Sequence, residues 1–223
     1  MKIILSILVL FLAIGLQAKE ASWKKMDRDE LGGYKRGDYH LRSDVQCLEI
    51  RTYFVDNKNR INRNYWSSPI TWSVKLFKAF SPKLMKSFRK AKPNLSRNGD
   101  IGKQEAGKIS NAFMIDDQNK MWRMNMTEDV IRYLGDIDML SEARLVLWLH
   151  GKQSPNRYRK TFRGYEFLIE YTKSSAGCQK CKPTETCIED KEIKEKAIVD
   201  KKGDIVLFKQ LESRILKQEC IAD

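Results

Sequence analysis

Histidine is scarce in this sequence, and the short motifs of common enzyme classes are absent. The 223 residues include two histidines, His40 and His150, and neither stands at the spacing of a metal-ligand pair or a catalytic triad. The sequence also has no Gly-x-Ser-x-Gly elbow and no glycine-rich phosphate loop. We therefore expect two structural histidines, no catalytic residue, no metal and no cofactor, which favours a non-enzymatic protein.

Long apolar runs are also rare, and the one that exists lies at the amino terminus. Lys2 precedes an apolar stretch at 3–16, and Gln17 and Ala18 separate it from the charged Lys19. As a helix these residues span about 21 Å, less than the roughly 30 Å hydrocarbon core of a bilayer. The order of charge, apolar segment and small residue is typical of a secretory signal. It predicts a signal peptide at 1–18, a periplasmic or secreted protein, and no transmembrane span after cleavage.

Acidic residues are missing from the segment between Asp56 and Asp100, which explains most of the net charge of +13. The eleven cations of this segment are Lys58, Arg60, Arg63, Lys75, Lys78, Lys83, Lys86, Arg89, Lys90, Lys92 and Arg97. The rest of the chain is close to neutral in total, so the excess predicts a basic patch and not a uniformly basic protein.

Aromatic residues accompany these cations, and the combination is typical of surfaces that bind phosphate-rich partners. Export makes nucleic acid a less favoured partner than an anionic membrane surface or envelope polymer, and a protein partner is an alternative. The predicted binding residues are Lys75, Lys78, Lys83, Lys86, Arg89, Lys90 and Trp66. A second interpretation is that Trp72, Leu76 and Phe88 belong to an ordinary core and the lysines form a solvated rim.

The acidic residues between Asp116 and Glu142 resemble no known cation loop. The spacing of Asp136 and Asp138 lacks the glycine and the downstream glutamate of a calcium-binding loop. This pattern favours a solvated turn.

Five cysteines are present, and export favours their pairing. A hairpin that pairs Val199 with Asp204 places Cys220 opposite Pro183, within a few residues of both Cys181 and Cys187. We expect a disulfide from Cys220 to one of these two cysteines. The full prediction is two disulfides among Cys178, Cys181, Cys187 and Cys220, with Cys47 left as a buried, inert thiol.

Two other interpretations of the cysteines remain open. The Cys178-x-x-Cys181 pair could be the site of a periplasmic thiol-disulfide enzyme, although such sites usually have the first sulfur at a helix amino end. Four thiolates could instead hold a structural zinc ion. That site usually repeats the short spacing, whereas Cys187 and Cys220 are 33 positions apart.

The apolar patterning predicts an α+β protein, mainly antiparallel sheet, with a carboxy-terminal strand meander, a few short helices and a disulfide staple. Residues 19–107 form an amino-terminal basic β/α region and residues 108–223 the meander, and the two can pack as one domain. Residues 56–64 look like a polar turn, and Ser81 and Thr127 are predicted helix caps. The predicted strands are 45–55, 70–76, 109–115, 120–126, 143–149, 158–171, 193–199 and 205–211.

Overall fold

The described residues fold into two antiparallel sheets and three short helices. The computed structural model describes residues 21–26, 39–56, 60–71, 80–93, 101–102, 107–176 and 185–222. The predicted mainly antiparallel sheet is confirmed and fits an α+β fold, whereas the predicted boundary at 107 stays untested. The strands are β1 (Lys24–Lys25), β2 (Val45–Val55), β3 (Ile61–Thr71), β4 (Lys108–Asp116), β5 (Met121–Met124), β6 (Arg157–Thr161), β7 (Gly164–Ala176), β8 (Glu185–Asp200) and β9 (Ile205–Ala222), and the helices are α3 (Pro82–Lys90), α4 (Thr127–Ile131) and α5 (Leu140–Leu149).

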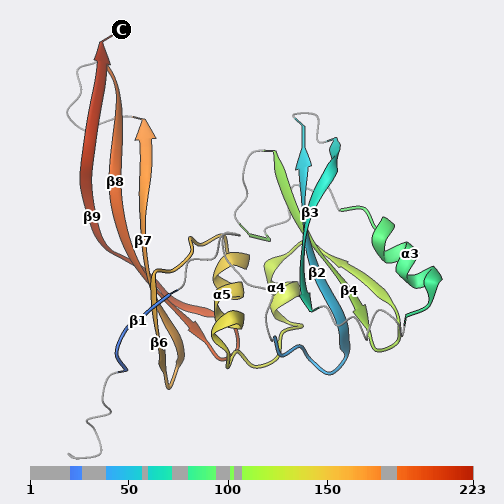
Figure 1. Cartoon of the computed structure of the whole chain (residues 1–223). Helices are drawn as coiled ribbons and strands as arrows, with labels where there is room; N and C mark the ends of the chain where they lie inside the picture. Colours follow the sequence, from blue (N-terminus) through green and yellow to red (C-terminus); the bar gives the residue numbers. More distant parts are fainter. Residues whose placement is uncertain are drawn as a thin grey trace, which may run out of the picture.

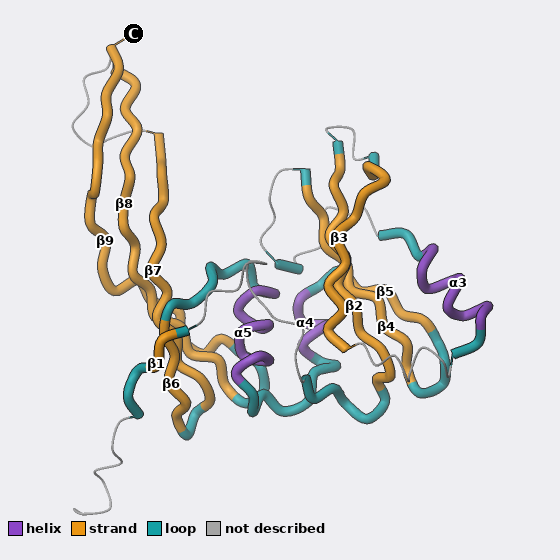
Figure 2. Tube along the Cα trace, in the orientation of Figure 1, coloured by secondary structure: helices purple, strands orange, loops and turns teal. Residues whose placement is uncertain are grey.

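The elements are arranged in layers (Figure 1). One sheet has the order β3-β2-β4-β5 and the other β1-β6-β7-β8-β9. Helices α4 and α5 lie between the two sheets, and α3 covers the outer face of the four-stranded sheet (Figures 1 and 2). The main core cluster joins residues of α4, α5 and both sheets, while a smaller cluster lies between α3 and the four-stranded sheet. Among the described residues, no helix is both long and apolar enough to cross a membrane.

The predicted strand at 143–149 is wrong, because this segment is helix α5. Its apolar residues occur at odd and even positions, which suits a strand covered on both faces. The same pattern also suits a helix buried on all sides, and periodicity alone cannot separate the two in a short run. Leu145, Val146, Leu147 and Leu149 are each no more than 1% exposed, because α5 packs between the two sheets.

Helix α3 begins as predicted. The Ser81 side chain accepts a hydrogen bond from the Leu84 backbone N–H at 3.2 Å, and Pro82 is the first helical residue. Met85 and Phe88 are buried and Leu84 is half-buried, so these three residues form the apolar side of this helix.

Helix α4 does not have the predicted cap. Thr127 is the first helical residue, and its hydroxyl donates a hydrogen bond to the Leu149 carbonyl at 2.7 Å. The side chain therefore joins α4 to the end of α5. The helix is short and ends at Ile131.

The polar stretch predicted as a turn at 56–64 is partly a strand. β3 begins at Ile61 and pairs with β2, so residues 61–64 are extended. The predicted strand at 70–76 coincides with β3 only at residues 70–71, and its remainder lies outside the described residues. The predicted strands at 45–55, 109–115 and 120–126 are confirmed as β2, β4 and the shorter β5, and β4 and β5 pair as a hairpin.

The predicted strand at 158–171 is two strands, β6 and β7, with a tight turn at Phe162 and Arg163. Gly164 follows this turn with a φ of 138°, and a Cβ there would lie 2.2 Å from the Val199 carbonyl oxygen. Only glycine allows β8 to approach β7 so closely at this point. Tyr165 and Phe167 contribute to the core, and Glu166 between them is also buried, in an ion pair with Arg159.

The predicted hairpin of β8 and β9 is confirmed, and its register explains the disulfide. Val199 pairs with Ile205 instead of Asp204, and three register shifts along the pair bring Cys187 directly opposite Cys220. These two cysteines form a disulfide with an S–S distance of 2.11 Å. The predicted link from Cys220 is thus confirmed with Cys187 as its partner. Cys178 and Cys181 lie outside the described residues, so a second disulfide stays a prediction.

Removing the disulfide tests its contribution to stability. The Cys187→Ser/Cys220→Ser double variant should lose about 3–4 kcal/mol in its free energy of unfolding, because the bridge closes a loop across 33 residues. Urea unfolding would measure this loss. Reduced parent protein is the matched control and should show a similar loss, whereas equal stability of the oxidised parent and the double variant would contradict the prediction.

The buried position of α5 makes a second prediction. Leu145 is 0% exposed, so Leu145→Ala should lower the free energy of unfolding by about 2–5 kcal/mol through lost burial and an internal cavity. Urea unfolding is again the measurement. Lys86→Ala on exposed α3 is the control, with an expected change within about 0.5 kcal/mol. A Leu145→Ala loss as small as that of the control would show that α5 is not packed between the sheets.

Candidate functional site

The outer side of α3 carries four exposed cations, Lys83, Lys86, Arg89 and Lys90, which we call the α3 basic face. The helix has no acidic residue. Within the described part of the chain, none of the four cations forms an ion pair, although ion pairs are common elsewhere, as between Arg159 and Glu166. The α3 basic face is therefore a surface of positive charge that the described residues do not neutralise.

The apolar side of α3 holds this face outward. Phe88 is 1% exposed and its ring meets that of Phe113 on β4 edge to face, with centroids 6.5 Å apart. Met85 belongs to the same buried cluster, together with Phe80 and Tyr53. Because these side chains fix the rotation of the helix on the sheet, its lysines and arginine are exposed to solvent. Figure 1 shows that α3 itself lies at the edge of the molecule.

A buried ion pair lies beneath α3. The Arg51 Nη2 atom is 2.9 Å from the Glu49 Oε2 atom, and both residues are at most 3% exposed. The guanidinium carbon of Arg51 lies 4.8 Å from the Phe88 ring centroid and 4.4 Å from that of Phe113. Burial by itself lowers the pKa of Arg51, but the hydrogen bond and charge of Glu49 outweigh burial and raise the pKa. Arg51 therefore stays positively charged, and its guanidinium group contacts the buried side of α3 at the Phe88 ring.

The end of α3 is also attached to this pair and to β5. The Arg51 Nη1 atom donates a hydrogen bond to the Ala91 carbonyl at 3.4 Å, and the exposed Arg123 donates one to the Lys92 carbonyl at 3.1 Å. Arg123 thus extends the positive surface onto β5. Sequence reasoning missed Arg123 because 31 residues separate it from Lys92, and only strand pairing brings it to the helix end.

The other three predicted binding residues are not part of α3. Trp66 lies on β3 opposite Thr52 of β2. Lys75 and Lys78 lie outside the described residues. The structure therefore brings together four of the seven predicted residues, all on α3.

One cluster of possible metal-ligating side chains occurs among the described residues, formed by His40, Asp138 and Glu142, whose ligand atoms lie within 4.8 Å of one another. The His40 Nδ1 atom is 3.1 Å from an oxygen of Asp138 and 3.6 Å from one of Glu142. Glu142 is 0% exposed, and its carboxylate accepts backbone N–H groups of His40, Asp138 and Met139. These bonds attach residue 40 to the start of α5, which is a structural role.

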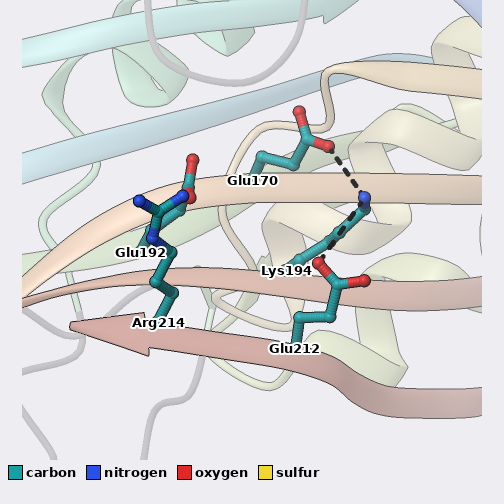
Figure 3. Close-up of a pocket in the computed structure, with 5 residues that line it drawn as sticks. All are labelled: Glu170, Glu192, Lys194, Glu212 and Arg214. Carbon is teal, nitrogen blue, oxygen red and sulfur yellow. Dashed lines mark ion pairs between the residues drawn. The ribbon is translucent and has the colours of Figure 1, made fainter. Parts of the chain in front are cut away.

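The sheet that contains β7, β8 and β9 has a charged groove on one face (Figure 3). Its volume is about 150 Å³, and it is lined by Glu170, Glu192, Lys194, Glu212 and Arg214. The Lys194 Nζ atom lies 3.6 Å from Glu170 and 3.9 Å from Glu212. Charges of opposite sign are therefore paired across neighbouring strands.

A second, more open hollow of about 480 Å³ lies beside the loop after α5. Lys152 is placed over the Phe208 ring at 3.8 Å, and the Tyr171 hydroxyl donates a hydrogen bond to Glu195 at 3.3 Å. Burial and the charge of Glu195 raise the pKa of Tyr171, so its hydroxyl stays protonated at neutral pH. This side chain is a hydrogen-bond donor and not a base.

The bonding of the cysteines affects the two alternative interpretations, a thiol-disulfide enzyme and a structural zinc site. Cys187 and Cys220 are joined, so two of the four sulfur atoms that the zinc site requires are already bonded to each other. The Cys178–Cys181 pair lies outside the described residues, and thiol exchange there stays a hypothesis. Cys47 is free and 2% exposed, as expected of an inert thiol.

The environment of Cys47 makes a prediction about its reactivity. Burial, with a smaller effect from Glu49, raises the pKa of this thiol to about 12. Because the thiolate is the reactive form, iodoacetamide at pH 8 should leave Cys47 unmodified in the folded protein and alkylate it after unfolding in urea. Peptide mass mapping would detect the difference. Rapid alkylation of Cys47 in the folded protein would contradict its burial.

Comparison with known proteins identifies no relative, since no family model matches the chain and neither a curated protein nor a solved structure matches it.

Proposed function

We propose that this chain is an exported, non-enzymatic binding protein whose α3 basic face engages an anionic partner, either a membrane surface or an envelope polymer. The observation that carries the proposal is the set of four exposed cations on a helix that has no acidic residue. The signal-like amino terminus supports a periplasmic or extracellular location.

The packing of α3 determines which of its side chains can contact an anionic partner. The apolar side of the helix is already buried against the sheet, so Met85 and Phe88 are not available to enter a bilayer. Binding through this face is therefore electrostatic and at the surface, unlike the binding of an amphipathic helix that inserts its apolar side. Such a contact weakens as salt rises, because exposed charges are screened beyond about 8 Å at physiological ionic strength.

The number of cations suits reversible attachment. Each cation near an anionic bilayer contributes about 1 kcal/mol, so the four residues of the α3 basic face contribute about 4 kcal/mol together. Arg123 and Lys92 at the end of the helix extend the same surface. The buried Arg51 pair keeps the helix in place, so the cations are positioned before the partner arrives.

Charge reversal tests the proposal. Lys83→Glu, Lys86→Glu, Arg89→Glu and Lys90→Glu introduced together should abolish co-sedimentation with vesicles rich in phosphatidylglycerol at low salt, because attraction becomes repulsion. The parent protein should bind these vesicles and release them at high salt. A parallel assay on immobilised heparin, a soluble polyanion, separates a polymer partner from a membrane partner.

The matched control reverses the same number and kinds of charge elsewhere. Lys173, Lys201, Lys202 and Arg163 are all exposed and lie outside α3, and changing all four to Glu alters the net charge equally. This control should retain most of the binding, and circular dichroism should show that both variants are folded. Equal loss in both variants would indicate a general charge effect, and failure of the parent to bind either ligand would refute the proposal.

A further inference from the structure

Among the described strands, β9 lies at the edge of its sheet. β9 ends the order β1-β6-β7-β8-β9 and pairs on one side with β8, and no other described strand pairs with it. All residues from 206 to 220 are exposed. Figure 1 shows β7, β8 and β9 extending together away from the helices. Around Ser213, the outer backbone edge of β9 can therefore accept a further strand as far as the described residues are concerned.

β9 carries charged residues and register shifts, which protect edge strands from pairing, but it lacks two other protective features. Such strands are usually short or interrupted by proline, whereas β9 runs from Ile205 to Ala222 without proline. It also carries most of the exposed large apolar side chains of the described residues. Those on β9 are Val206, Leu207, Phe208, Leu211, Ile215 and Leu216.

On the face that has the charged groove, charged side chains alternate in sign from one strand to the next. Glu170 on β7, Lys194 on β8 and Glu212 on β9 form one row of alternating sign, since Glu170 pairs with Lys194 and Lys194 with Glu212 in the strand register. In the next row Glu192 pairs with Arg214. Figure 3 shows the two rows side by side. At the outer edge of β9, the first row ends with the negative charge of Glu212 and the second row ends with the positive charge of Arg214.

We propose that a second copy of this chain pairs with β9, antiparallel, about a two-fold axis at Ser213. This arrangement places Glu212 of each copy opposite Arg214 of the other. Both rows then continue across the interface with alternating sign, and opposite charges directly across an antiparallel pair are stabilising. The interface is self-complementary, as a two-fold dimer requires.

The apolar side chains fit the same register. With the axis at Ser213, Leu211 of each copy lies opposite Ile215 of the other. These side chains are 45% and 54% exposed in the single chain. The small Ser213 at the axis leaves room for these apolar pairs to meet beside it, so pairing removes apolar surface from water.

Neighbouring registers are less favourable for an electrostatic reason. An axis at Glu212 places this carboxylate opposite its own copy, and an axis at Arg214 places two guanidinium groups together. Like charges directly opposite one another destabilise a strand pair. The charge pattern therefore selects Ser213 over the adjacent positions.

Complementary charge variants test this dimer. Glu212→Arg alone creates two Arg–Arg contacts, and Arg214→Glu alone creates two Glu–Glu contacts, so each variant should be monomeric. A mixture of the two should dimerise again, because every contact then joins an arginine to a glutamate. Sedimentation velocity on the purified protein at low micromolar to high micromolar concentration would report a twofold change in mass.

The outcomes are distinct. A dimeric parent, two monomeric variants and a dimeric mixture support the proposal, and recovery in the mixture also shows that both variants are folded. A parent that stays monomeric overturns it, including the case in which β9 binds a different protein. A dimer that both variants leave intact overturns it as well, because another surface then joins the copies. The α3 variant with four reversed charges should remain dimeric.

Discussion

The burial of α5 between the two sheets is the constraint on which the rest of this fold depends. Among the described residues, the main core cluster that joins the inner faces of both sheets contains five residues of this helix and Val130 of its neighbour α4. A helix in that position needs apolar residues on most of its surface and a partner for each backbone group at its ends. Glu142 meets the second need, because its buried carboxylate accepts N–H groups at the start of α5 and from residue 40.

The layered core leaves two unlike surfaces far apart on the molecule. On one side, the smaller cluster and the Arg51–Glu49 pair hold α3 with its cations outward. On the other, the long hairpin of β8 and β9 extends beyond the region that the helices cover (Figures 1 and 2). The two proposals use separate residues and do not compete. A two-fold assembly through β9 would carry two α3 basic faces, and two linked contacts bind an extended anionic surface more strongly than either alone.

Several elements could be predicted from local sequence. The wrong predictions share one cause, because each of those segments depends on contacts with distant parts of the chain. Ser81 and Pro82 specify the start of α3 through contacts within one helical turn, and Gly203 allows the tight hairpin turn with a φ of 87°. A short apolar run such as 143–149 suits a central strand and a buried helix equally well. Its sequence therefore predicts a strand where the structure has a helix. Thr127 likewise has the chemistry of a cap, but its hydroxyl has a better partner in the Leu149 carbonyl, which is close only in the folded chain.

The sequence by itself determined the mainly antiparallel sheet, the hairpin at the carboxy terminus, a disulfide from Cys220 and the four cations of α3, because each depends on residues near in sequence or on period-two alternation. Tertiary structure alone decided that α5 is a helix, that Cys187 is the disulfide partner, and that Arg123 joins the end of α3. It also decided that β9 is an edge with alternating charges. These features depend on packing between distant segments and on register shifts, and neither leaves a signal in local composition.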